Sequence, residues 1–191
     1  MKQALEQDES GATLVEFAIL LPVLLGLLMG LMDLCYQAYV QAVLEGAVQK
    51  AARDATIEAA NTTTIDDRVI AAVRQVAGKA TVTPSRLFYA SFSVIKPEDF
   101  IDGNGNGRYD PGECFTDING NGQWDMDPGR AGQGGASDVT VYKVRASYTR
   151  IFPVARLIGL SNNVVLTAAT RFKNQPYATQ SIPAPQQISC Q

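Results

Sequence analysis

The residues best suited to chemistry are acids and amides that recur in two glycine-rich segments near the middle of the chain. The first segment begins at Asp102, and the second begins fifteen residues later at Asp117. In each, oxygen-bearing side chains fall at the first, third, fifth and ninth positions, and glycine falls at the sixth. Alternate residues of a tight loop point inward, and Ca²⁺ takes about six to eight oxygen ligands. The spacing therefore predicts Ca²⁺ as a cofactor.

The first segment matches every ligand position of a twelve-residue EF-hand-type loop. Its glycine at the sixth position, Gly107, permits the sharp turn that such a loop needs. Because a glutamate at the twelfth position can bind through both oxygens, we expect this loop to be the tighter site. The expected ligands are the side chains of Asp102, Asn104, Asn106, Asp110 and Glu113, with the main-chain carbonyl of Arg108.

The second segment lacks a ligand at its twelfth position, where Pro128 stands. We expect Asp125 or Asp127 to compensate, and the site to be weaker or differently shaped. The expected ligands here are Asp117, Asn119, Asn121, the main-chain carbonyl of Gln123, Asp125 and Asp127.

A flexible loop without metal is the alternative, because Asn-Gly and Asp-Gly pairs are common turn residues. The fixed period of the two units favours metal binding. No amphipathic helix pattern flanks either unit, so we do not expect a regulatory EF-hand. The two units are more similar to the short calcium-stabilised repeats of extracellular bacterial proteins. Without metal, we expect this acidic segment to have no hydrophobic reason to fold.

Composition argues against two functional classes. The chain has no histidine, which removes the commonest general base and the commonest transition-metal ligand, so we expect no enzyme. Its formal net charge of -3 provides no basic face for phosphates, so we expect no nucleic-acid partner. Outside the cytoplasm, Cys114 and Cys190 could pair in a disulfide, and two free thiols are the alternative. Cys35 is expected to be buried.

An apolar segment from Leu14 to Leu34 is long enough to span a hydrocarbon core of about 30 Å as a helix. A cleaved signal peptide is the alternative, but the residues before the segment are mainly acidic and those after it suit signal peptidase poorly. We therefore expect a retained anchor in a bacterial inner membrane. Glu16 lies near its start, where an ionised carboxylate is costly unless it reaches water or a partner charge.

Periodicity beyond the anchor predicts helices followed by strands. An apolar stripe continues the first helix to about residue 55, through Tyr36, Val40, Val43, Ala47 and Ala51. A second helix is expected after an N-cap at Thr64, with Ile65, Val69, Val73 and Val76 on its apolar face. Strands are expected at 87–95, 139–148 (with one slip in register) and 164–172. This order predicts an α+β fold with a three- to four-stranded antiparallel sheet on the long helix.

The segment from Gly11 to Pro22 resembles the N-terminus of TadE/TadG-like proteins, the minor pilins or pseudopilins of the tight-adherence (Tad/Flp) pilus. The resembling features are Gly11, the pair Glu16 and Phe17 that begins five residues later, and an apolar run that contains Pro22. Weaker similarity occurs at 51–54 and 166–177. The leader is acidic, whereas basic residues are usual in this family.

The resemblance implies cleavage between Gly11 and Ala12 by a prepilin peptidase, and assembly with other pilin or minor pilin subunits through Glu16 and Phe17. The expected organisation is a leader (1–11), a transmembrane and assembly helix (12–55), an exported domain (56–175) and an extended tail (176–191). The calcium loops form an insertion at 97–137. The alternative function is a stand-alone membrane-anchored module, calcium-binding or adhesive, that never enters a filament.

Overall fold

A computed structural model describes residues 10–57, 60–152, 154–157, 159, 161–176 and 185–188, and it confirms the expected α+β fold. The elements along the chain are α1 (Ser10–Ala55), α2 (Thr62–Val76), β1 (Thr81–Tyr89), the 3-10 helix η1 (Phe92–Val94), β2 (Phe115–Asp117), β3 (Arg130–Ala131), β4 (Val139–Thr149), α3 (Val154–Leu157), β5 (Asn163–Lys173) and β6 (Gln186–Ile188).

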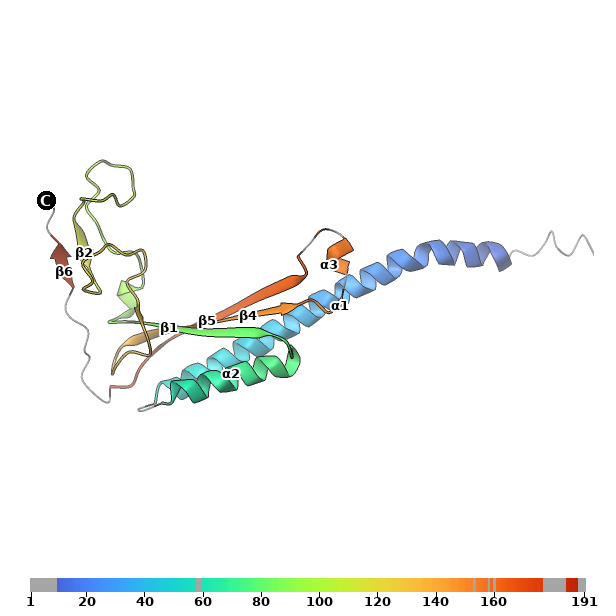
Figure 1. Cartoon of the computed structure of the whole chain (residues 1–191), viewed down its shortest axis with the longest axis horizontal. Coiled ribbons are helices and arrows are strands. Elements are labelled where there is room, and N and C mark those ends of the chain that lie inside the picture. Colours follow the sequence, from blue (N-terminus) through green and yellow to red (C-terminus); the bar gives the residue numbers. More distant parts are fainter. Residues whose placement is uncertain are drawn as a thin grey trace, which may run out of the picture.

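Helix α1 is one continuous element of 46 residues, as predicted, and it passes through Pro22 without ending. At 1.5 Å rise per residue its length is roughly 70 Å. Its N-terminal half projects beyond the rest of the protein, whereas its C-terminal half lies against α2 and the sheet (Figure 1). The helix therefore has two different environments along one axis.

The core lies between the C-terminal half of α1, helix α2 and one face of the sheet. On α1 the most deeply buried side chains are Val40, Leu44 and Val48, which recur every four residues. The predicted stripe was partly wrong, because Leu44 and Val48 occupy its centre. Val43 is only half-buried. Of the four apolar residues predicted on α2, Ile65, Val69 and Val73 are buried, as expected, and Val76 is half-buried.

Helix α2 begins earlier than its sequence pattern indicated. Its N-cap is Asn61, whose Oδ1 accepts a hydrogen bond from the main-chain N–H of Thr64 at 3.0 Å. The predicted cap, Thr64, therefore lies in the first turn. Asparagine is as effective an N-cap as serine or threonine, so either residue fitted the sequence pattern.

The main sheet has four antiparallel strands, in agreement with the three to four expected, and their order is β3-β1-β4-β5. Strand β1 begins six residues before its predicted start, includes Pro84, and gives way to η1 where a strand was expected. Strand β4 has no slip in register: Tyr142, Val144 and Ala146 face the core and pair continuously with β5. The slip expected within this strand was therefore wrong.

A polar cluster joins α2 to the sheet. Arg86 on β1 donates two hydrogen bonds of 2.6 Å to the carboxylate of Asp66 on α2. The hydroxyl of Tyr142 donates a third to the same carboxylate at 2.7 Å, and burial together with this bond raises the Tyr142 pKa. The arginine also lies over the Tyr142 ring, 4.3 Å from its centroid. Because the pair is bidentate and mostly buried, it fixes the angle between α2 and the sheet.

An ion pair between Asp33 and Arg150 joins α1 to the end of β4. Both side chains are mostly buried, with 11% and 17% of their surface exposed. Next to it, the Tyr36 and Tyr148 rings pack edge to face at 5.8 Å. The hydroxyl of Tyr36 donates to the Val76 carbonyl at 2.6 Å. These contacts mark the point along α1 at which the helix enters the folded domain.

Removing the arginine of this ion pair should loosen the helix from the sheet. In Arg150→Ala, Asp33 keeps its charge in a mostly buried position, and we expect a loss of about 2 kcal/mol in the free energy of unfolding. Arg145→Ala, at an exposed position of β4, should cost much less. Denaturant unfolding of the full chain in detergent measures both. Equal costs for the two variants would contradict the assigned role.

Candidate functional site

The two glycine-rich loops lie between β1 and β4, at the end of the molecule opposite to the N-terminal half of α1 (Figure 1). Two short pairings tie this region down. Strand β3 pairs with β1, and β2 pairs with β6 from the C-terminal tail. The loops are therefore attached to both the main sheet and the tail, and do not form a simple excursion between strands.

The first loop is organised around Asp102. Its Oδ1 accepts hydrogen bonds from the N–H groups of Gly105 at 2.7 Å and Asn106 at 3.2 Å, and its Oδ2 accepts one from Gly107 at 2.7 Å. The Gly107 bond is the main cause of a lowered Asp102 pKa. Gly105 and Gly107 have φ of 74° and 72°, which a side chain would disfavour. The glycines therefore allow the main chain to wrap around the carboxylate.

The other expected ligands of the first loop converge on the same turn. The amide nitrogens of Asn104 and Asn106 each donate to Asp110 Oδ2 at 2.7 Å. The Glu113 carboxylate accepts from the N–H of Gly103 at 2.9 Å through Oε1, and from that of Asp110 at 3.0 Å through Oε2. The structure thus brings the five predicted side chains of the first loop together. The main-chain N–H of Arg108 donates a hydrogen bond to Asn106 Oδ1.

The second loop repeats this geometry. Asp117 accepts hydrogen bonds from the main chain of Gly120, Asn121 and Gly122 at 2.6, 3.3 and 2.8 Å. The amide nitrogens of Asn119 and Asn121 both donate to Asp125 Oδ2 at 2.7 Å. The N–H of Gln123 donates to Asn121 Oδ1, as Arg108 does to its neighbour in the first loop. The fifteen-residue period in the sequence is therefore a structural repeat.

The two loops differ at the twelfth position, and Asp127, one of the two residues expected to compensate there, has another role. Asp127 Oδ1 accepts hydrogen bonds from the hydroxyl of Tyr89 at 2.6 Å and from the N–H of Gly129 at 3.2 Å. Burial and this contact with Asp127 raise the Tyr89 pKa. Asp127 thus joins the loop to β1. The residue that contacts the second loop instead is Glu98, which the sequence analysis missed. It stands fifteen residues before Glu113, and this spacing was the available signal.

Four aromatic side chains pack between the loops. Tyr109 and Trp124, each at the eighth position of its loop, stack at 4.8 Å with 11° between their planes. Phe100 packs edge to face on both rings, and Phe115 on Tyr109. Phe115 and Ile118 are buried. The expectation that this segment has no hydrophobic reason to fold was wrong, because the two loops share a small aromatic core.

Metal binding stays a prediction. Among the described residues, no three acidic or cysteine side chains are grouped as a metal cluster would require. In both loops asparagine amide nitrogens lie against the ninth-position carboxylate, where a cation would otherwise neutralise its charge. The donor set is nevertheless rich in carboxylate and amide oxygens, the ligands that Ca²⁺ prefers.

The three cysteines are far apart in the sequence. Cys114, beside the first loop, is disulfide-bonded. Its predicted partner, Cys190, lies outside the described residues, so that pairing stays a prediction. Ile188 on β6 is opposite Phe115 on β2, so the tail passes close to Cys114. Cys35 was expected to be buried, but it is free and exposed on α1.

The expected cleavage and assembly residues lie at the beginning of α1. Gly11 is the second residue of the helix, and a Cβ placed there would meet no other atom within 4 Å. Ala12 follows in the same turn. Glu16 and Phe17 are both exposed. Most of the expected leader, residues 1–9, lies outside the described residues.

The N-terminal half of α1 is an exposed apolar surface. Its hydropathy and length are sufficient to cross a membrane, and no residue of its most apolar window is buried. Among the described residues no other helix meets this criterion. The large apolar side chains exposed on α1 are Leu14, Val15, Phe17, Ile19, Leu20, Val23, Leu24, Leu25, Leu27, Leu28, Met29, Leu31, Met32, Leu34 and Tyr39.

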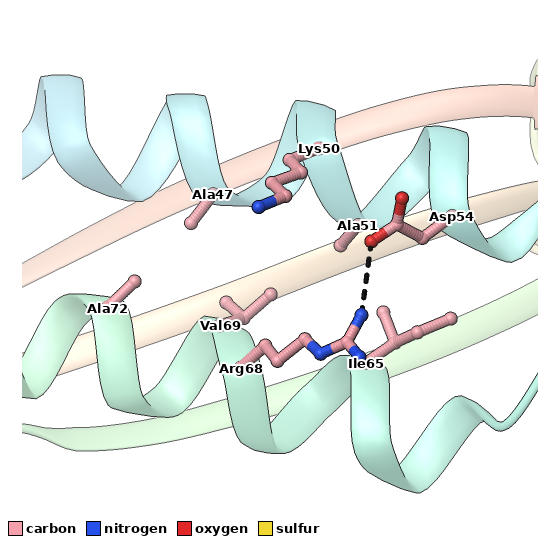
Figure 2. A pocket seen from close by; sticks show the side chains of 8 residues that line it. All are labelled: Ala47, Lys50, Ala51, Asp54, Ile65, Arg68, Val69 and Ala72. Carbon is pink, nitrogen blue, oxygen red and sulfur yellow. Dashed lines mark ion pairs between the residues drawn. The ribbon is translucent and has the colours of Figure 1, made fainter.

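A groove between α1 and α2 is lined mainly by alanine, isoleucine and valine (Figure 2). Its charged groups are Lys50 and the ion pair between Arg68 and Asp54, which measures 3.5 Å. An exposed pair of this kind contributes little to stability. We interpret the groove as ordinary packing between two helices.

Comparison with known proteins finds a family match within the N-terminal helix. Residues 11–53 match the model of the family described as TadE-like protein. No curated protein and no solved structure is significantly similar to the chain. The matched segment begins at Gly11, contains Glu16, and ends two residues before α1 does. Residues 11–53 are thus similar to the TadE-like protein family, as the N-terminal sequence predicted.

Proposed function

We propose that this protein is a structural, minor pilin-like subunit of a Tad-type pilus, held in a bacterial inner membrane by α1 and assembled through it. The family match over residues 11–53 supports an association with the pilus. The observation that carries the proposal is the division of α1. Its C-terminal half is covered by the protein's own domain, whereas the apolar side chains before Asp33 are uncovered.

This uncovered surface needs an apolar environment, because exposed leucine and phenylalanine side chains are unfavourable in water. The segment from Leu14 to Met32 is close to the thickness of a hydrocarbon core, about 30 Å. Lipid can cover it before assembly, and the helices of other subunits can cover it afterwards. In both states Glu16 is the charge that needs a partner, and the α-amino group of a neighbouring subunit cleaved before Ala12 would supply one.

A stand-alone membrane-anchored module is the second candidate function. The observation that favours it is the position of the paired loops at the end of the molecule farthest from the apolar half of α1 (Figure 1). A ligand-binding or adhesive surface held away from a membrane would have this arrangement. The N-terminus of the mature protein separates the candidates, because only the subunit requires cleavage.

We further propose that the first loop binds Ca²⁺ outside the cytoplasm. Asp102, Asp110 and Glu113 would supply the charge, and Asn104 and Asn106 would turn their amide oxygens toward the ion. The support is the convergence of these five side chains on one turn. A bound ion would replace the hydrogen bonds that now hold the Asp110 carboxylate.

Changing Gly11 should block maturation without changing the fold. Gly11→Leu places a bulky side chain before the expected cleavage point, and no neighbouring atom opposes it. We expect the uncut precursor to accumulate in the membrane. Gly26→Leu, an equally open position on the same helix, should be processed normally. Mass spectrometry of the intact protein measures both, and a Gly11→Leu product that begins at Ala12 would contradict the proposal.

Neutralising Glu16 should separate insertion from assembly. Glu16→Gln makes the helix more apolar, so the protein should still enter the membrane and be cleaved. Its incorporation into sheared pili should fall by about tenfold or more, because a neighbour's amine loses its partner in a low-dielectric contact. Glu45→Gln, at an exposed position of α1 outside the apolar half, is the control. Equal incorporation of both variants would count against the pairing.

Calcium should protect the loops from proteolysis. In the detergent-solubilised full chain, we expect millimolar Ca²⁺ to slow cleavage within residues 102–127, because bound metal lowers the population of open loops. Glu113→Gln should raise the calcium concentration needed by about tenfold or more, while the main sheet stays folded by circular dichroism. Protease sensitivity that does not respond to calcium in the wild-type protein would favour a metal-free loop.

A further inference from the structure

The side chain of Glu98 lies against the second loop, outside the twelve residues of either repeat. We propose that Glu98 is the twelfth-position ligand of a second calcium site, so that the two loops form a matched pair of sites. This inference rests on the calcium binding proposed above. It assigns to the second loop a ligand that its own sequence lacks, because Pro128 occupies that position.

The contacts of Glu98 reproduce those of Glu113. Glu98 Oε1 accepts a hydrogen bond from the N–H of Ile118 at 2.7 Å, and Oε2 accepts one from the N–H of Asp125 at 3.0 Å. These donors are the second and ninth residues of the second loop. The donors to Glu113 are the second and ninth residues of the first loop, at 2.9 and 3.0 Å. Each loop therefore has a glutamate carboxylate in the same place.

Burial gives a second and independent indication of a cation. Only 1% of Glu98 and 4% of Asp117 is exposed. Carboxylates removed from water require a compensating charge, and main-chain N–H groups supply only dipoles. Within the described residues, no ion pair involves Glu98, Asp117 or Asp125. Arg130 reaches the loop, but it donates to the Asn119 carbonyl. A divalent cation bound by oxygens is the charge that suits this site.

The main chain of Glu98 is held in register with the second loop. Its N–H donates to the Asp125 carbonyl at 3.0 Å, and its carbonyl accepts from Trp124 Nε1 at 2.9 Å. Trp124 in turn stacks on Tyr109 of the first loop. Glu98 is therefore positioned by the loop that it would complete, and that loop is packed on the first. We expect a signal from Trp124 when either site is filled.

Calorimetric titration of Ca²⁺ into the chelator-treated full chain in detergent tests the assignment. The wild-type protein should bind two ions. Glu98→Gln should bind one, with the second site weakened by at least about 100-fold, and Glu113→Gln should also bind one. Asp99→Asn is the matched control, because this neighbouring carboxylate is exposed and pairs only with Lys96 among the described residues. It should still bind two.

A conservative variant distinguishes metal binding from a purely structural role. Glu98→Asp keeps the charge but shortens the side chain, whereas Glu98→Gln keeps the length and one acceptor oxygen. A ligand role predicts that Glu98→Asp retains a weakened second site and Glu98→Gln does not. A purely structural role, in which Glu98 only accepts hydrogen bonds from the loop, predicts instead that Glu98→Gln retains the second site better than Glu98→Asp does.

Two ions bound by Glu98→Gln with wild-type affinities would overturn the assignment, and so would loss of both ions in that variant. A wild-type protein that binds one ion, lost in Glu113→Gln, would overturn this inference while leaving the calcium proposal for the first loop intact. A wild-type protein that binds none at millimolar Ca²⁺ would overturn both.

Discussion

The constraint on which the rest of this structure depends is that one helix must satisfy two environments. From Asp33 onward, α1 supplies the central row of the protein core, with Val40, Leu44 and Val48 against α2 and the sheet. Before Asp33 the side chains exposed on the same helix are mainly apolar. The ion pair with Arg150 lies at the boundary and fixes where the domain sits along the helix. Because the helix is continuous, an orientation imposed on its apolar half by lipid or by other subunits is transmitted directly to the domain.

At the other end of the molecule, contacts within the protein chain order the two loops. Their turns wrap around Asp102 and Asp117, and the aromatic stack of Tyr109 on Trp124 packs one turn on the other. Pairing of β2 with β6, and the disulfide at Cys114, secure the base of this region. Most of the ordering is therefore already present in the protein chain. Calcium would act by neutralising carboxylates that the fold has gathered, which is why weak sites would suffice at the calcium concentrations found outside cells.

The sequence predicted the features that depend on local pattern and missed those that depend on contacts between distant segments. The long helix, strands β4 and β5, and the repeat of the loops follow from periodicity, which acts over a few residues. The cap at Asn61 was missed because several residues there are able to cap a helix. Glu98 was missed because its role arises only when the chain folds back on the second loop. The aromatic core was missed for the same reason, since Phe100 and Trp124 are far apart in sequence.

The central claim, that α1 serves both to anchor and to assemble the protein, is tested most directly by asking what touches its apolar half in assembling cells. A photo-crosslinking amino acid in place of Leu20, which is 65% exposed, would report on this surface. The account predicts adducts to the helices of other pilus subunits, recovered in the sheared pilus fraction. Adducts to lipid alone, with the protein confined to the membrane fraction, would contradict assembly and favour a stand-alone anchored module.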